Sequence, residues 1–157
     1  MIKEIYILNK GGIGLFYQNF SDKIEGDEQL AASLFNVIQT FAETYLNEEV
    51  RSIVADNDKL LFFQGDSFSI IIRTDMNSKL DEKSKKLKAL RDEFFKRYHK
   101  NLKYNITDIS IYDDFEETIR NIFKIEKKPK HRSSELLQQF FGIPIKKINL
   151  KKLIHSL

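Results

Sequence analysis

The sequence predicts an α+β fold in which helices cover both faces of a five-stranded antiparallel sheet. Three observations lead to this class. The chain opens with two apolar strands around a glycine turn, three short strands follow one helix, and two further helices close the body. The predicted order is β-β-α-β-β-β-α-α over residues 1–123. Residues 124–157 form a basic C-terminal tail with short helices.

The composition fits a globular domain. The chain has 157 residues, of which 41% are hydrophobic and 12% aromatic, enough to build a core. It has no Cys, which excludes disulfides, thiolate metal sites and a Cys nucleophile and fits a reducing compartment. We find no signal peptide and no apolar stretch long enough to span a bilayer. The expected location is therefore the cytoplasm, with possible peripheral contact to a membrane.

The opening hairpin is the centre of the predicted sheet. Its first strand places Ile2, Tyr6 and Leu8 on one face and Ile5 and Ile7 on the other, a pattern typical of a strand covered on both sides. The glycines that follow at 11, 12 and 14 could suggest a phosphate loop. Such a loop must open a helix, whereas a second strand follows here, so we interpret the segment as a turn. Gly14 indicates a bulge or close helix packing.

Asp27 is a candidate N-cap for a helix over residues 28–46. A stripe at helical spacing is expected to face the core, and it comprises Leu30, Leu34, Val37, Ile38, Phe41 and Tyr45. Four more apolar residues widen the stripe on one side, namely Ala31, Phe35, Ala42 and Leu46. They are either additional core or a second strip that faces a partner. We take these four as the candidate partner-binding residues.

Three strands are expected over residues 50–55, 60–64 and 68–73, with turns at 56–58 and 65–67 too short for anything but antiparallel pairing. Ser78 with Asp81 resembles a capping box for a helix over 79–103, whose lysines 83, 85, 86 and 88 point mainly outward. Asp113 with Glu116 resembles a second capping box, for a helix over 114–124.

No catalytic constellation stands out in the sequence. The histidines at 99, 131 and 155 lack ligand spacing, and the carboxylates at 56–58 and 113–117 match a turn and a helix start. We therefore expect no catalytic, cofactor-binding or metal-binding residues, and no enzymatic activity.

The tail differs from the body in charge. Residues 124–157 carry nine basic and two acidic residues, a net charge of +7, so the remaining residues carry −4 of the total of +3. The candidate docking residues of the tail are Lys146, Lys147, Lys151 and Lys152. Lysines interleaved with apolar residues are typical of segments that contact anionic membranes or dock in a groove, but the tail could equally fold back on the body. Because the body is acidic and only the tail is basic, no nucleic-acid binding is expected.

The sequence resembles the longin family. The stretch IYILNKGGIGLFYQNFS, residues 5–21, looks most like the longin-type N-terminal domain of the signal recognition particle receptor α subunit, and FFKRYHKNL, residues 94–102, is similar to that domain's long second helix. The resemblance implies the sheet order 2-1-5-4-3, with edges at 13–20 and 50–55. It also implies a non-enzymatic platform that binds small Ras-type GTPases or other longin or roadblock domains, with a homodimer possible.

Two functions therefore compete. The first is an interaction module that binds or regulates a small GTPase in a trafficking-like or membrane-associated complex. The second is a sensor of the profilin or PAS kind, which holds a small molecule between sheet and helices and needs a cavity with converging polar groups. The aromatic content of the core favours the first.

Overall fold

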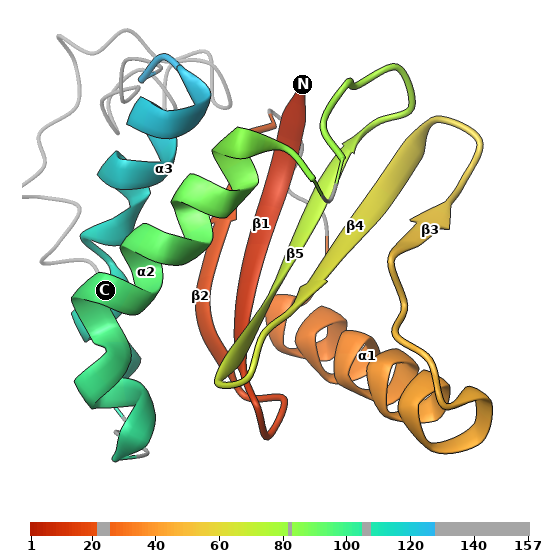
Figure 1. The fold of residues 1–157 in the computed structure, drawn as a ribbon. Coiled ribbons are helices and arrows are strands. Elements are labelled where there is room, and N and C mark those ends of the chain that lie inside the picture. The colour runs from red at the N-terminus through yellow and green to blue at the C-terminus, as the bar shows by residue number, and fades with distance from the viewer. Residues whose placement is uncertain (22–25, 82, 105–107, 128–157) are drawn as a thin grey trace, which may run out of the picture. The chain divides into compact units, whose positions relative to one another are not determined.

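Five strands form one antiparallel sheet in the order β2-β1-β5-β4-β3 (Figure 1). The strands are β1 (Ile2–Asn9), β2 (Gly14–Asn19), β3 (Ser52–Val54), β4 (Asp58–Gln64) and β5 (Phe68–Asp75). The computed structural model describes residues 1–21, 26–81, 83–104 and 108–127, nearly all of them in one compact unit, Met1–Ile125. The predicted fold class and sheet order are confirmed. The helices predicted in the tail lie outside the described residues.

β1 is an inner strand between β2 and β5, and six of its eight side chains are buried. The hairpin as a whole is not the centre of the sheet as predicted, because β2 forms one edge and β5 is the middle strand. Ile5 and Ile7 face one side and Tyr6 and Leu8 the other, as predicted. Ile2, however, joins Ile5 and Ile7 instead of Tyr6. The pairing of β1 with β5 shifts register between Ile2 and Glu4, and one extra residue in a strand moves the following side chains to the other face.

The hairpin turn connects β1 directly to β2, which confirms the structural turn. Gly12 donates its N–H to the Asn9 carbonyl at 3.0 Å and has a positive φ of 82°, a conformation that favours glycine. Gly14 lies beside α1, where an added Cβ would be 3.7 Å from Ala32 Cβ, and a register shift separates its pair from the next. Both predicted roles of Gly14, close helix packing and a bulge, are therefore present at this point.

One face of the sheet is covered by α1 (Glu28–Phe41), which continues as a π-helix, η1 (Ala42–Leu46) (Figure 1). Asp27 is the N-cap, and its carboxylate accepts the N–H groups of Gln29 and Leu30 at 2.9 and 3.2 Å. The predicted helix over 28–46 is therefore confirmed at both ends. The cluster beneath it comprises Tyr6, Leu8, Ala32, Phe35, Phe62 and Ile71.

The other face carries the larger core, beneath α2 (Lys85–Lys103), the 3₁₀ turn η2 (Ile109–Tyr112) and α3 (Phe115–Phe123). Phe94 of α2 is fully buried at its centre. Its ring centroid lies 4.9 Å from those of Phe68, Tyr98 and Phe115 and 5.6 Å from that of Tyr112. Aromatic rings at such distances stabilise the core beyond the area that they bury.

Both predicted capping boxes are wrong. Ser78 Oγ accepts the N–H of Leu80, and Asp81 accepts that of Lys83, so each side chain closes a local turn and α2 begins only at Lys85. Side chains that bond the backbone two residues ahead compete with helix formation. At the last helix, α3, the N-cap is Asp114 instead of the predicted Asp113, and it makes no side-chain capping bond. The turn η2 comes before it, and the helix begins at Phe115.

Candidate protein-binding surface

The two faces of α1 differ in exposure, and both are apolar. The face toward the sheet buries Ala32, Phe35, Gln39 and Ala42. The opposite face presents a row at helical spacing, which we call the outer stripe, with exposed fractions of 69% for Leu30, 56% for Leu34, 62% for Val37, 54% for Phe41 and 76% for Tyr45. Large exposed apolar patches of this kind mark interaction sites.

The structure therefore reverses the predicted orientation of this helix. The residues expected in the core, apart from the half-buried Ile38, form the outer stripe. Of the four candidate partner-binding residues, Phe35 and Ala42 are buried, Ala31 is half-buried and only Leu46 is exposed. The small side chains of Ala32 and Ala42 let the helix approach the sheet closely, and larger side chains there would hold it away.

The aromatic residues of the outer stripe lie at its C-terminal end. Phe41 and Tyr45 stack on each other, with 5.1 Å between ring centroids and 27° between ring planes. Tyr45 belongs to η1, and π-helical turns are frequent at functional sites. Aromatic residues are also the anchors that carry most binding energy at protein interfaces. We therefore expect this end of the stripe to contribute most of the binding energy of the surface.

An open groove separates η1 from the edge strand β3. Its lining runs along the chain and comprises Ala42, Glu43, Leu46, Asn47, Glu48, Glu49, Val50, Arg51 and Ser52. Asn47 turns the chain here with a positive φ of 54°. β3 pairs with β4 on one side, its other edge is unpaired among the described strands, and Val54 is 63% exposed. An unpaired edge beside an apolar helix offers a partner both backbone and side-chain contacts.

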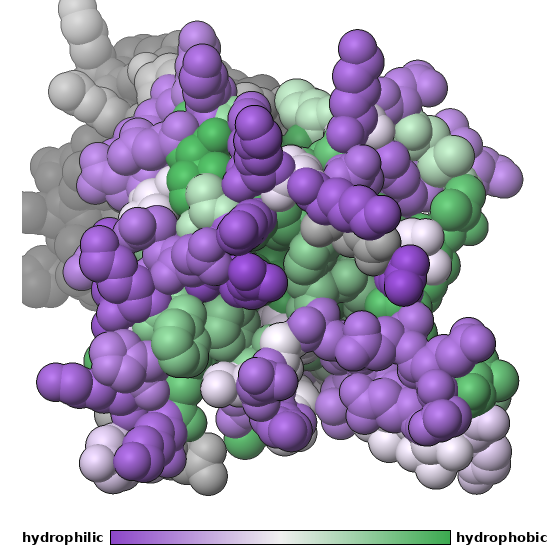
Figure 2. Space-filling model, viewed as in Figure 1, coloured by the Kyte–Doolittle hydropathy of each residue, from purple (hydrophilic) through white to green (hydrophobic). Residues whose placement is uncertain are grey.

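The outer face of α2 is of the ordinary kind. Hydrophilic side chains predominate on it in the space-filling view (Figure 2), with Phe95 as an exposed apolar residue. The lysines at 85, 86 and 88, and Lys83 just before the helix, are exposed as predicted. The buried residues of this helix are Leu87, Leu90, Phe94 and Tyr98. α2 thus has one apolar face, turned to the core, whereas α1 has a second one that nothing among the described residues covers.

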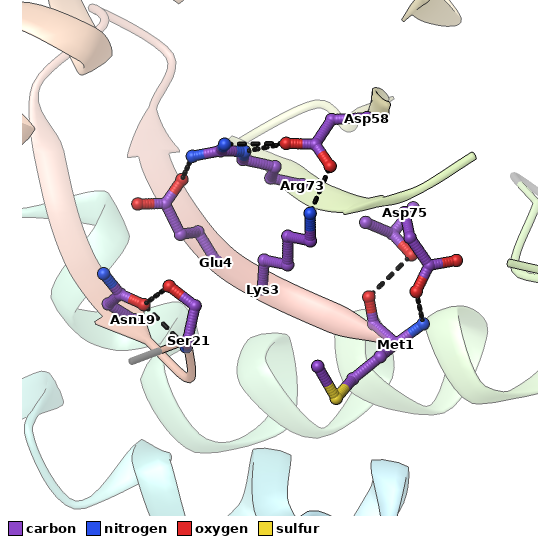
Figure 3. A network of polar contacts seen from close by, with 9 residues as sticks. Met1, Lys3, Glu4, Asn19, Ser21, Asp58, Arg73 and Asp75 are labelled. Atoms are coloured by element: carbon purple, nitrogen blue, oxygen red, sulfur yellow. Dashed lines mark hydrogen bonds and ion pairs between the residues drawn. The ribbon is translucent and has the colours of Figure 1, made fainter. Parts of the chain in front are cut away.

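A polar network ties four strands together, and Figure 3 shows its charged members on β1, β4 and β5. Arg73 of β5 donates to Glu4 of β1 at 3.2 Å and to Asp58 of β4 at 2.8 Å, and Lys3 pairs with the same Asp58. Tyr17 of β2 donates its hydroxyl to Glu4 at 3.1 Å. The hydrogen bond from Lys3 lowers the pKa of Asp58, and burial raises the pKa of Tyr17. With each carboxylate held by a cation, the network is structural and resembles no acid–base pair.

No pattern in the sequence predicts this network, because its members lie far apart in the chain. Lys3 and Asp58 are 55 residues apart, and Glu4 and Arg73 are 69 apart. The sequence predicts a turn at Asp58, whereas this residue opens β4. Only the register of the sheet brings these charges together, and no local motif could have signalled it.

The cavities and the potential metal ligands of the described residues complete the picture of possible sites. A cavity between β1, β2 and the start of α1, lined in part by Tyr6, Gly14 and Gln29, has a volume of about 120 Å³, whereas the groove beside η1 measures about 960 Å³ and is open to solvent. Ligand pockets typically measure about 300–1,000 Å³. Within the described ranges no group of three potential metal ligands gathers, and no helix is long and apolar enough to cross a membrane. His99 is exposed on α2 beside Phe95, while His131, His155 and the four candidate tail lysines lie outside the described residues.

No known family model matches this sequence, and no curated protein matches it either. Among solved structures the chain is similar to MglB of Myxococcus xanthus, with 16% sequence identity over 82% of this chain and 83% of that chain. The TM-score of this superposition is 0.39.

Proposed function

We propose that this chain is a non-enzymatic interaction module that docks a protein partner on the outer stripe of α1. The partner class is a small Ras-like GTPase, or another longin or roadblock-type domain, in a trafficking-like or membrane-associated complex. The observation that carries the proposal is the exposure of five large apolar side chains in one row on a helix whose opposite face is already packed on the sheet. The partner class comes from the resemblance of the sequence to longin domains.

The size of the outer stripe fits a docking role. Its side chains are between 54% and 76% exposed. Burying one such side chain completely is worth about 1.5–3 kcal/mol, so covering the remaining area of all five is worth roughly 6 kcal/mol. Association costs about 4–15 kcal/mol in lost freedom of motion. The stripe supplies a large part of that free energy, and the groove and the β3 edge offer the remaining contacts.

The sensor alternative is less well supported. A sensor of this kind holds its ligand between sheet and helix, and the cavity in that position, between β1, β2 and α1, is smaller than typical ligand pockets. The groove beside η1 is as large as a ligand pocket, but it is open to solvent and does not lie between sheet and helix. The aromatic side chains of the core pack on one another, as the rings around Phe94 illustrate. The interaction module is therefore the better supported of the two functions.

The test is capture of small Ras-like GTPases, loaded with GTP or GDP, by the immobilised chain. A stripe variant, Leu34→Gln with Val37→Gln, removes apolar area without changing a buried residue. A matched control, Phe95→Gln with Tyr104→Gln, removes two exposed apolar side chains outside the stripe. We expect the wild type and the control to retain a GTPase in one nucleotide state and the stripe variant to lose it. Equal capture by all three proteins would show that the stripe is not the docking surface.

A further inference from the structure

All charges along α1 and its following turn are acidic. Between Gly26 and Val50 the chain has no Lys, Arg or His and has five acidic residues, Asp27, Glu28, Glu43, Glu48 and Glu49. All five are exposed. Two precede the outer stripe and two follow it, while Glu43 lies on its last turn. The apolar stripe is therefore bordered by negative charge at both ends.

The negative charge is strongest at the C-terminal end of the stripe. The C-terminus of a helix carries about −0.5 elementary charge from its aligned peptide dipoles. Neither the last turn of α1 nor that of η1 has a basic residue to balance it. The groove beside η1 adds Glu43, Glu48 and Glu49 against the one basic residue of its lining, Arg51. At the other end, Asp27 is held by helix N–H groups, so the positive end of the dipole balances part of its charge.

A second copy of this chain fits the surface poorly. In a two-fold dimer the same patch meets itself, so the acidic ends of the stripe of one copy would approach the acidic ends of the other. Because both ends of the stripe are acidic, parallel and antiparallel helix pairs both bring like charges together. Like charges across an interface select against such a partner. An anionic membrane has the same sign of charge and is disfavoured for the same reason.

We propose that the outer stripe docks a different protein, one whose contact surface is apolar and bordered by Lys or Arg, with one basic side chain entering the groove between η1 and β3. This inference rests on the proposed function and specifies the chemistry of its partner. Apolar contact provides the affinity, and charge complementarity at the border selects the partner and speeds association.

The absence of Trp from the chain gives a clean optical test. Two helical peptides of equal length share a Leu face that carries one Trp, and their polar positions are all Lys in one and all Glu in the other. Each is titrated into the full chain, and Trp fluorescence and anisotropy report binding. Only binding that the stripe variant loses is counted, because either peptide can also meet charges elsewhere. At low salt we expect the Lys peptide to bind the stripe at least about tenfold more tightly than the Glu peptide, a preference that high salt reduces.

Variants that remove acidic charges show which residues cause the preference for the Lys peptide. Neutralising the groove with Glu43→Gln, Glu48→Gln and Glu49→Gln should remove most of the preference for the Lys peptide. Neutralising three exposed acids elsewhere, with Asp66→Asn, Asp92→Asn and Glu117→Gln, should leave it unchanged. Equal stripe-dependent affinity for both peptides, or no effect of the groove variant, overturns the charge inference while the stripe remains a docking surface. Binding of neither peptide by the stripe counts against the proposed function itself.

The same proteins test whether a second copy of the chain or a membrane covers the outer stripe instead. We expect the full chain to be monomeric by light scattering at low salt, and no stripe-dependent sedimentation with vesicles of phosphatidylserine and phosphatidylcholine. A dimer that the stripe variant abolishes would assign the surface to a second copy and overturn the proposal. Vesicle binding that the stripe variant abolishes would assign it to a membrane, with the same consequence.

Discussion

The ring of Phe35 meets the ring of Tyr6 edge to face, with 5.1 Å between the centroids and 78° between the planes. On its other side Phe35 meets Phe62 in the same manner, at 5.8 Å and 88°. Phe35 of α1 thus packs on the sheet between a ring of β1 and a ring of β4, the two strands that flank β5. This contact fixes which face of α1 is buried and, in consequence, which face is exposed.

Phe35→Ala is expected to lower the free energy of unfolding by about 3–5 kcal/mol, because it removes a buried ring and leaves a cavity. The matched substitution Val37→Ala, on the outer stripe of the same helix, should change it by less than about 0.5 kcal/mol. Urea denaturation of the two variants and the wild type measures the difference. Similar losses in both variants would contradict the orientation of α1 described above.

The period of this helix could be predicted from the sequence, but its orientation could not. Both faces have helical spacing, and the outer stripe, with its Leu, Val, Phe and Tyr, is the more apolar of the two. Hydropathy therefore selects the wrong face. The buried face includes Gln39, whose amide oxygen lies 3.4 Å from the hydroxyl of Ser69 on β5. That polar partner is supplied by the sheet, and a single helix reveals neither it nor the fit of Phe35.

Gly12 and Asn36 couple the hairpin turn to α1. A Cβ at Gly12 would overlap the Asn36 side chain, and Gly12 also has a positive φ. Gly26 has a similar φ of 76°, but a Cβ there would meet no described atom within 4 Å. We expect Gly26→Ala to cost about 1–2 kcal/mol from backbone strain alone. Gly12→Ala should cost more, by at least about 1 kcal/mol.

A double-mutant cycle separates the two effects at Gly12. Adding Asn36→Ala should recover much of the excess loss of Gly12→Ala but should not change the loss of Gly26→Ala, as thermal or urea denaturation can show. Strict additivity at Gly12 would mean that the turn does not press on α1 through Asn36.

The polar network around Asp58 and Arg73 predicts that the stability of the fold depends on pH. The pKa of Asp58 is lowered in the folded chain, first by the hydrogen bond from Lys3 and then by Arg73. A carboxyl whose folded pKa lies below its unfolded value of about 3.9 stabilises the fold above that value, and this contribution is lost as pH falls through the folded pKa. Asp58→Asn should therefore be less stable than the wild type at neutral pH and lose less stability on acidification below about pH 5.

The comparison isolates Asp58. The pKa values of Asp75 and Asp108 are also lowered, by the N-terminal ammonium and by Ser110, but both groups titrate in the wild type and in the variant alike. Asp56→Asn, in the exposed turn after β3, serves as the control and should keep the acid slope of the wild type. If Asp58→Asn keeps that slope as well, the network does not stabilise the sheet through ionised Asp58.

The last prediction concerns residues 124–157, which carry a net charge of +7 against −4 for the other residues. We expect this tail to be a docking element that contacts an anionic membrane or an acidic partner; the alternative is that its charges bind the acidic body of the same chain or of a second copy. A basic residue near an anionic surface gains about 1 kcal/mol, so replacing Lys146, Lys147, Lys151 and Lys152 with Gln should strongly reduce co-sedimentation with anionic liposomes. The matched control replaces the four exposed lysines at 83, 85, 86 and 88. Equal loss in both variants would show that only total charge matters. No sedimentation of the wild type even at low salt would exclude the membrane and leave an acidic protein as the partner to test.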